Sequence, residues 1–402
     1  MPAPLHRTVR SLGLVSLLTD ASSEMIYPLL PAFLTGTLRA GPAFLGVVEG
    51  LAETTAAVLK IVSGRVSDRL ARRKPLVVAG YALSSLARPL VALATLPAHV
   101  LAVRLADRVG KGVRSAPRDA LVAEVVAPED RGRAFGFQRA MDHAGAMVGP
   151  LLASAALLVT KDLRIVFALA AVPAVLAVAT LVRGVREEPR ATAPDPATTA
   201  PAAEPAARVE PALLRYLGVL ALFTLGNSSD AFLLLRAQET GIALAAIPAI
   251  WALHHLVKAG ASTWGGALSD RVGRRFVILA GWGVYALAYA GFAAAASPVA
   301  IVGLFAFYGL FHALTEGAER ALVADLAGET TRGRAFGLFH AVTGAALLPA
   351  SLLTGFLWQR FGAPVALGTG AALASLAALG LLAFVPEPGP PASRSEPPRR
   401  RG

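Results

Sequence analysis

The chain has 402 residues, of which 55% are hydrophobic and only 16% are charged. Soluble domains carry about 25% charged residues, so this composition practically excludes a water-soluble globular protein. The absence of cysteine excludes disulfides, thiolate metal sites, iron–sulfur clusters and cysteine nucleophiles. The net charge of +12 would suit a nucleic-acid partner, but the basic residues do not form one tract.

The hydropathy pattern predicts twelve helices that can each cross a membrane, which takes about 20 residues. The first carries Asp20 and Glu24 and has no small-residue cleavage site, so we expect it to be retained rather than removed as a signal peptide. The uncharged stretch 276–311 is broken near Ser297-Pro298, which indicates the end of one span and the start of the next. In chain order, the expected helices cover residues 11–35, 44–66, 75–95, 98–123, 134–159, 163–182, 213–235, 244–268, 276–296, 299–325, 335–357 and 362–385.

This pattern predicts an all-α integral membrane protein with twelve transmembrane helices in two six-helix halves. We expect the N-terminal half at residues 1–185 and the C-terminal half at residues 212–386. Residues 186–211 between them are rich in Pro, Ala and Thr, a composition that predicts a flexible cytoplasmic linker. The tail at residues 387–402 is rich in Pro and Arg, and we expect it to be a disordered cytoplasmic segment.

The distribution of lysine and arginine predicts the orientation in the membrane. If the twelve helices alternate in direction, 23 of the 38 lysines and arginines fall on one side of the membrane and 5 on the other. Cytoplasmic loops carry the excess of basic residues, so both termini are expected in the cytoplasm. This asymmetry also explains the basic net charge without a nucleic-acid partner.

Two blocks of sequence recur with nearly the same spacing. Residues 64–73 (GRVSDRLARR) resemble residues 266–275 (GALSDRVGRR) at an offset of 202, and the pair 120–124 and 131–136 recurs at an offset of 201. This recurrence indicates an internal duplication. Because each copy holds an even number of helices, the copies run parallel and are related by an axis along the membrane normal, with a binding site expected between them.

With these motifs the sequence resembles a Major Facilitator Superfamily transporter over essentially its whole length. The loop at 266–275 fits the family signature G-x-x-x-D-R-x-G-R-R fully, whereas the loop at 64–73 has Ala71 in place of its second glycine. The resemblance implies that these loops latch one conformation, with Asp68 pairing with neighbouring helix ends. A role in topology and lipid headgroup contact alone is the alternative. The implied latch residues are Gly64, Asp68, Arg69, Arg72, Arg73, Gly266, Asp270, Arg271, Gly273, Arg274 and Arg275.

Two further motifs resemble the same family. On the fourth helix, residues 108–116 resemble the motif R-x-x-Q-G-x-G-A-A, with Lys111 and Arg114 in place of its glutamine and second glycine. The fifth helix resembles the motif of the proton-coupled antiporter branch, which exports drugs, and this likeness implies export. Close helix packing by small residues is the alternative. The motif residues are Gly136, Gly145, Gly149 and Pro150.

Charged side chains inside a membrane are costly and need a partner or a function. Asp20 and Glu24 share one helix face, and so do Glu49 and Glu53, because each pair is four residues apart. The fourth helix carries a basic stripe at intervals of three and four residues, which the two acidic helices are expected to face. Its members are Arg104, Arg108, Lys111, Arg114 and Arg118.

Two interpretations of these charges stay open. In the first, they form structural salt bridges that fix the register of the helices. In the second, at least one carboxylate binds a proton and carries it across the membrane. The candidates for proton coupling are Asp20, Glu24, Glu53, Glu49 and Asp142, in this order. The candidates for binding substrate or lining a cavity are Arg108, Lys111, Arg114, Arg118, His143, Asp230, Lys258, His312 and Glu316.

We therefore expect a monomeric secondary transporter of the bacterial inner membrane that alternates access to a small-molecule substrate and a proton. Proton-coupled export of a small organic molecule is favoured, and proton-coupled import of an anionic metabolite is the alternative. We expect no cofactor and no metal. Gly110-Lys111-Gly112 lacks the spacing and the hydroxyl residue of a phosphate-binding loop, so ATP is not expected to drive transport. An intramembrane enzyme is a remote alternative, since no paired nucleophile and base is evident.

Overall fold

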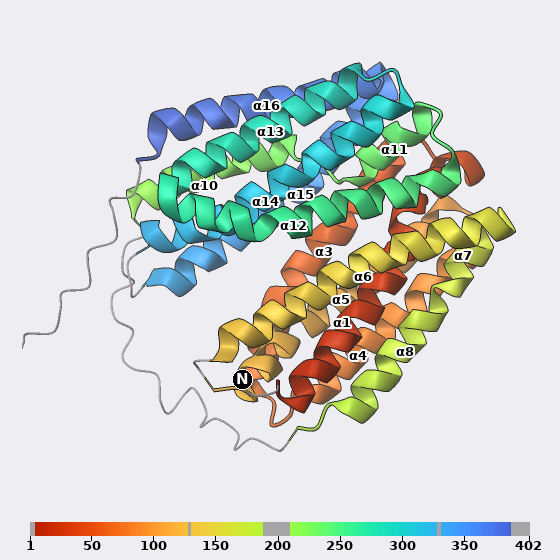
Figure 1. Cartoon of the computed structure of the whole chain (residues 1–402), viewed down its shortest axis with the longest axis vertical. Coiled ribbons are helices and arrows are strands. Elements are labelled where there is room, and N and C mark those ends of the chain that lie inside the picture. The colour runs from red at the N-terminus through yellow and green to blue at the C-terminus, as the bar shows by residue number, and fades with distance from the viewer. Residues whose placement is uncertain (1–4, 128–129, 188–209, 328–330, 387–402) are drawn as a thin grey trace, which may run out of the picture.

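The computed structural model describes residues 5–127, 130–187, 210–327 and 331–386, and these residues are mostly helical (Figure 1). The first half contains α1 (Arg7–Ile26), η1 (Tyr27–Leu29), α2 (Leu30–Ala32), η2 (Phe33–Thr37), α3 (Pro42–Arg69), α4 (Lys74–Ala87), η3 (Arg88–Leu93), α5 (Pro97–Glu124), α6 (Arg131–Thr160), α7 (Leu163–Leu169) and α8 (Ala171–Gly184). The second half contains α10 (Pro211–Gly226), α11 (Ala231–Glu239), η5 (Leu244–Ala246), α12 (Ile247–Val272), α13 (Arg274–Ala294), α14 (Pro298–Leu326), α15 (Arg332–Phe361) and α16 (Ala363–Phe384).

Helical elements occupy every one of the twelve ranges predicted from the sequence. Within the described ranges, nine helical segments are long and apolar enough to cross a membrane. The predicted spans built on α1, α3 and α5 are not among these nine, and they carry most of the intramembrane charges of the first half. The chain is therefore a multi-pass helical protein whose most polar helices belong to one half.

The seventh predicted span is not the single helix expected over residues 213–235. It is interrupted between α10 and α11 by the sequence Asn227-Ser-Ser-Asp230. Short polar side chains compete with the helix for backbone hydrogen bonds, and the Ser229 hydroxyl accepts one from the Ala231 amide at 3.3 Å. Inside a membrane such irregular backbone is tolerated where it is buried in protein or lines a cavity. The expectation that Asn227 and Asp230 lie within a helix is therefore wrong.

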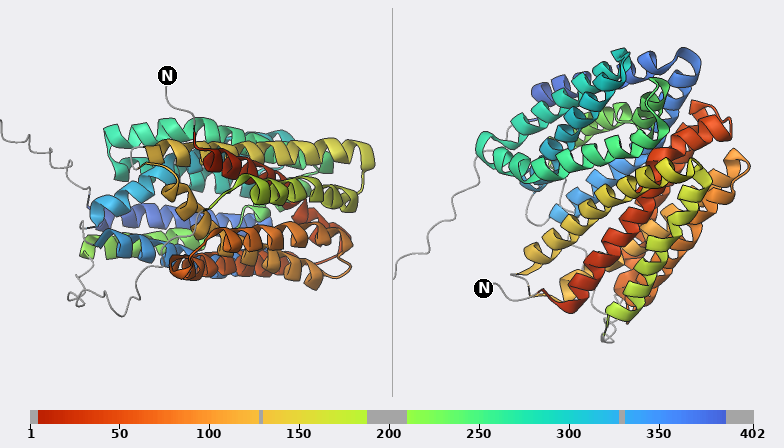
Figure 2. Two further views of the ribbon diagram at one scale, coloured as in Figure 1. Left: turned by 90° about the horizontal axis from the view of Figure 1, so that it is seen from below. Right: turned by 45° about the vertical axis from the view of Figure 1, so that its right-hand side comes forward.

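The helices form two bundles that lie side by side, α1–α8 in one and α10–α16 in the other (Figures 1 and 2). The bundles pack through α3 on α15, α6 on α12 and α2 on α11. They splay apart toward the ends where α1 and α10 begin (Figure 1). In the described part of the chain, the hydrogen bonds between the halves involve only residues 24–54 of the first half, so the halves are joined toward one face of the membrane. The expected linker (186–211) and tail (387–402) lie almost entirely outside the described residues.

Close helix packing depends on two glycines of the fifth-helix motif. A methyl group on Gly149 would collide with the Ala21 backbone of α1, and one on Gly145 would lie 3.0 Å from the Cβ atom of Asp20. Small residues allow helix backbones to approach this closely in membranes. Gly136, by contrast, has no atom within 4 Å of the added methyl position. The motif therefore fixes α6 against α1 through its second and third glycines, followed by the buried Pro150 inside α6.

Candidate functional site

A cavity of about 300 Å³ lies between the two halves, near the face where they are joined. This volume is at the small end of the range found for ligand pockets. The lining comes from α1, η1, α3 and α5 in the first half and from the 227–230 break, α14 and α15 in the second. The lining residues are Glu24, Tyr27, Glu49, Glu53, Arg108, Lys111, Asn227, Ser228, Ser229, Asp230, Tyr308, His312, Leu347 and Ser351.

Two carboxylates of α3 are neutralised by arginines of α5. The Arg104 guanidinium donates to Glu49 at 2.7 Å, and Arg108 Nε lies 2.9 Å from a Glu53 oxygen. Glu49 is 1% exposed and also accepts from the Ser229 hydroxyl across the cavity at 3.1 Å. The prediction that the acidic second helix faces the basic fourth helix is confirmed by these pairs.

Arg88 belongs to the same network. It begins η3, and its Nε atom donates to Asp107 of α5 at 2.7 Å while a terminal nitrogen donates to the Thr19 carbonyl of α1 at 2.9 Å. Both charged side chains are almost completely buried. The Arg88 side chain therefore turns inward and joins three elements, η3, α5 and α1.

Three other carboxylates of the region have no cationic partner within ion-pair distance. Glu24 accepts from the Trp251 indole of α12 at 2.8 Å, and Asp230 accepts from the Tyr308 hydroxyl of α14 at 2.7 Å. Asp20 forms no hydrogen bond or ion pair with any described residue and lies one helical turn before Glu24. The region therefore contains carboxylates in two electrostatic settings, one neutralised by arginine and one not.

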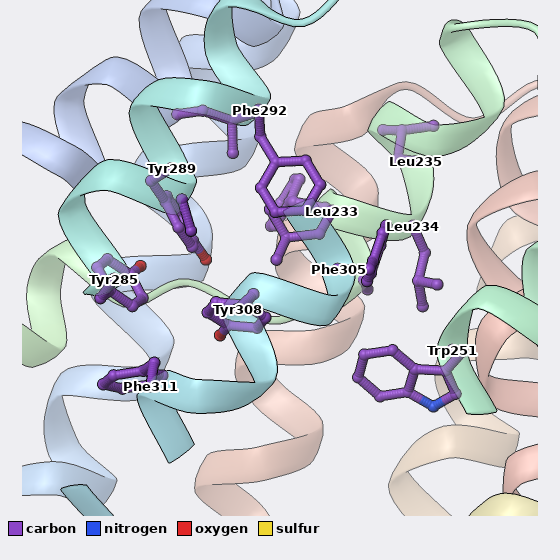
Figure 3. Packing of buried hydrophobic residues seen from close by; sticks show 14 of the residues in the cluster. Leu233, Leu234, Leu235, Trp251, Tyr285, Tyr289, Phe292, Phe305, Tyr308 and Phe311 are labelled. Carbon is purple, nitrogen blue, oxygen red and sulfur yellow. The ribbon is translucent and has the colours of Figure 1, made fainter. Parts of the chain in front are cut away.

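The partner of Asp230 is held by an aromatic cluster in the second half (Figure 3). The Tyr308 ring lies 5.7 Å from that of Phe311, 6.1 Å from that of Tyr289 and 5.2 Å from that of His254. Such packing leaves the phenol few alternative rotamers. The carboxylate of Asp230 is thus fixed at the helix break by a rigid neutral donor.

The basic stripe of α5 divides into two parts. Arg108 and Lys111 line the cavity, and the exposed Lys111 ammonium has no hydrogen-bond or ion-pair partner among the described residues. Arg114 instead stacks 4.4 Å from the centre of the Tyr81 ring and donates to Ser84 at 2.6 Å. Arg118 pairs with its neighbour Asp119 at 2.9 Å. Neither Arg114 nor Arg118 is among the lining residues of the cavity.

The remaining candidates lie around the cavity without lining it, apart from His312. Lys258 of α12 pairs with Glu316 of α14 at 2.6 Å, and His312 Nδ1 lies 3.8 Å from the same carboxylate. Asp142 and His143 of α6 are half-buried outside the lining. Within the described ranges, no group of three or more His, Cys, Asp and Glu side chains is placed to hold a metal ion.

The loop between α3 and α4 is organised by one arginine. Arg73 donates to the Ser67 hydroxyl at 3.0 Å and to Asp68 at 3.1 Å, and it also pairs with Glu124 at the end of α5. Glu187 accepts from the backbone amides of Arg73 and the next residue, both at 2.7 Å, which places a carboxylate at the start of α4. Apart from Glu187, which follows the first half in the chain, these contacts all lie within the first half.

The second half repeats this arrangement around Arg274. Its guanidinium donates to Ser269 at 2.7 Å, lies 3.4 Å from Asp325 at the end of α14 and also pairs with Asp270. The structural counterpart of Arg274 is therefore Arg73. The sequence alignment at an offset of 202 had instead matched it with Arg72, so that alignment is wrong by one residue in this turn.

The extra residue of the first loop explains both offsets and the missing glycine. Gly273 has a φ of 96°, which favours glycine, whereas Ala71 is not among the residues with positive φ in the longer loop. The residue after each of these two arginines caps a helix. Lys74, after Arg73, donates to the Val185 carbonyl at 2.7 Å, and Arg275, after Arg274, donates to the Leu382 carbonyl. Two predicted latch glycines have space around them: a methyl group added at Gly64 would lie 3.5 Å from the Cβ atom of Ala116, and one added at Gly266 would meet no atom within 4 Å. The remaining predicted latch residues, Arg69, Arg72 and Arg271, are exposed.

Sequence reasoning did not select several residues that line the cavity. Tyr27 and Tyr308 resemble ordinary apolar-helix aromatics in the sequence, and Leu347 and Ser351 carry no charge to mark them. The polar run 227–230 was the available signal, because clusters of Asn, Ser and Asp mark breaks in helical patterns.

A cavity between two joined bundles of apolar helices, lined by intramembrane acids and bases, defines a polytopic membrane carrier. The two halves repeat one arrangement of loops and helix ends. The Major Facilitator Superfamily profile matches residues 12–253 and 216–402, and the chain belongs to this family. It is therefore a secondary transporter of small molecules.

The relatives agree with this class. The chain is 36% identical over 363 residues to an uncharacterised MFS-type transporter of Methanocaldococcus jannaschii, an alignment that covers 88% of this chain and 89% of the relative. It is 31% identical over 150 residues to the multidrug resistance protein MdtH of Photorhabdus laumondii, covering 36% of this chain and 37% of that protein. The crystal structure of a D-xylose-proton symporter matches with a TM-score of 0.74 and 17% identity, covering 96% and 99% of the two chains, which shows a common fold.

Proposed function

We propose that the chain is a proton-coupled exporter of a small organic molecule that works by alternating access. The observation that supports this most directly is the presence of two kinds of carboxylate in one region. Glu49 and Glu53 are each neutralised by an arginine, whereas Glu24 and Asp20 are not. Proton coupling needs a carboxylate that can lose its charge without leaving a buried cation unpaired.

Glu24 is suited to link the proton to the conformational change. Its hydrogen bond to Trp251 joins the two halves at the face where they are packed together. A carboxylate accepts such a bond more strongly than a neutral carboxyl group does, because the acceptor is charged. Protonation of Glu24 therefore weakens this contact and favours separation of the halves on that side.

The orientation follows from the loops. The halves splay apart toward the ends where α1 and α10 begin, which is the side that carries the loops rich in arginine (Figure 1). Since cytoplasmic loops carry the excess of basic residues, this side is proposed to face the cytoplasm, with both termini there, in the plasma membrane. The described conformation is then open to the inside.

Export is supported by α6 and by one relative. The glycines of α6 and the partial similarity to MdtH, whose name states multidrug resistance, favour export. The second candidate is proton-coupled import of an anionic metabolite, which the unpaired Lys111 and the neighbouring Arg108 in the cavity favour. The similarity to the D-xylose-proton symporter concerns the fold alone.

The two directions give opposite results in reconstituted vesicles. Purified protein in proteoliposomes is supplied with labelled drugs, sugars, amino acids and organic acids under an imposed pH gradient. An exporter that exchanges substrate for protons accumulates its substrate when the vesicle interior is acidic, and a symporter does so when the exterior is acidic. A protonophore removes the gradient as a control. Accumulation that ignores both gradients contradicts the proposal.

A further inference from the structure

The charges of the cavity do not all cancel. Of its four carboxylates, Glu49 and Glu53 are paired with arginines of α5. In the proposed function, Glu24 binds the proton. The two charges that remain are the ammonium of Lys111, which has no partner among the described residues, and the carboxylate of Asp230, whose partner is the neutral Tyr308 hydroxyl.

These two charges belong to opposite walls of the cavity. Lys111 comes from α5 in the first half, and Asp230 comes from the break between α10 and α11 in the second. They do not form an ion pair with each other, although both line the same space of about 300 Å³. Apart from Glu24, which is assigned to the proton, the site therefore presents one positive group and one negative group without an ionic partner to whatever binds between the halves.

We propose that the substrate is a small zwitterion, whose cationic group binds Asp230 and whose anionic group binds Lys111. This inference rests on the proposed function, because it takes the cavity as the transport site. Tyr27 and Tyr308 line the same space, and the Tyr308 hydroxyl holds the Asp230 carboxylate in place beside it. A ligand held at both ends connects the two halves, as a transported substrate must.

Compounds with only one charge satisfy only half of the site. A bound anion leaves Asp230 without a counter-charge, and a bound cation leaves Lys111 without one. Binding of either compound is weakened because the remaining charge is desolvated without a partner. We expect the singly charged analogue of a bound zwitterion to bind at least about tenfold more weakly than its parent. The cavity volume of about 300 Å³ accommodates small compounds such as an amino acid or a short conjugate of one.

The test is an equilibrium binding measurement on the full chain in detergent, without any gradient. The probes are L-α-amino acids with neutral side chains, taurine and trimethylammonium carboxylates. For each amino acid, the N-acetyl derivative supplies the anion and the methyl ester supplies the cation. Thermal stabilisation titrated with each compound gives its affinity. We expect stabilisation by at least one zwitterion and at least about tenfold weaker binding of both of its derivatives.

Charge-removing variants assign the two ends. In Lys111→Gln, the preference for the zwitterion over its ester is expected to disappear, and in Asp230→Asn the preference over the N-acetyl derivative is expected to disappear. Lys60→Gln, at an exposed lysine of α3 that does not line the cavity, and Glu239→Gln are matched controls in which both preferences persist. Each comparison uses two ligands of one variant, so a general loss of stability cannot produce the result.

The failure of this inference is distinct from failure of the proposed function. The proposal that the substrate is a zwitterion is contradicted if the protein is stabilised only by anions, only by cations, only by uncharged compounds or by none of the probes. If a pH gradient drives flux of a singly charged compound, the proposal of a zwitterionic substrate is contradicted and proton coupling is supported. Binding of zwitterions with no gradient-driven flux would support the site and overturn proton coupling.

Discussion

Replacing Arg88 with methionine tests whether the buried ion pair with Asp107 stabilises the first half. The donor and acceptor are 2.7 Å apart, and the side chains are 5% and 2% exposed. Two unit charges about 4 Å apart attract by about 4 kcal/mol at an effective dielectric constant of 20. Breaking a buried pair by removing one partner costs about 3–5 kcal/mol, because the other charge stays buried.

The neighbours of Asp107 place the expected effect at the lower end of this range. Arg108 and Arg104 lie 3.4 and 3.9 Å from its second oxygen and compensate part of the lost charge. The hydrogen bond from Arg88 to the Thr19 carbonyl, worth about 1 kcal/mol, is lost as well. We therefore expect Arg88→Met to lower the free energy of unfolding by about 3–4 kcal/mol.

Equilibrium unfolding in mixed micelles measures this change, followed by tryptophan fluorescence. The control is Arg360→Met, at an exposed arginine near the end of α15, with an expected change within about 0.5 kcal/mol. Adding Asp107→Leu to Arg88→Met removes the orphaned charge, so the double variant is expected to lose less than the sum of the single losses. Two results would contradict a stabilising ion pair between Arg88 and Asp107. One is a fall in the free energy of unfolding of less than about 1 kcal/mol in Arg88→Met, and the other is a loss in the double variant that equals the sum of the single losses within about 0.5 kcal/mol.

Three further predictions follow from the packing of the halves and loops. Gly149→Val forces α6 away from α1, so it is expected to abolish folded protein in size-exclusion profiles, whereas Gly136→Ala, with open space around it, leaves the profile unchanged. Trp251→Phe removes the indole hydrogen bond to Glu24 that joins the halves. A single cysteine introduced on the closed side of this cysteine-free chain is therefore expected to react faster with a thiol label, and an unchanged rate would contradict the assigned contact. Arg73→Ala is expected to lower the melting temperature by several degrees more than Arg72→Ala, since only the former holds the loop; equal effects would contradict the structural alignment.

The helices could be predicted from the sequence because the membrane demands long apolar segments, whatever their tertiary partners. The positions of helix ends and the facing of α3 toward α5 followed from hydropathy and from charges four residues apart. The repeated loops also revealed two related halves. The break at 227–230 was missed because its flanks are strongly apolar, and the hydropathy average over the segment conceals four polar residues.

The composition of the cavity was harder to predict. Helical periodicity places Arg108, Lys111 and Arg114 on one broad face, yet only the first two line the cavity, because Arg114 finds Tyr81 and Ser84 inside the first half. Pairings across the halves, such as Glu24 with Trp251, depend on how the two bundles dock. No local pattern in the sequence contains that information.

The central claim is that a carboxylate without a cationic partner carries the proton. The most direct measurement compares gradient-driven accumulation with substrate exchange at equal pH in proteoliposomes of Glu24→Gln, Asp20→Asn and the double variant. Glu239→Gln is the matched control, since its carboxylate also accepts an indole hydrogen bond, from Trp358 at 2.9 Å, but does not line the cavity. The account predicts that at least one variant loses accumulation and keeps exchange, while the control keeps both. Gradient-driven accumulation that survives in the double variant would contradict it.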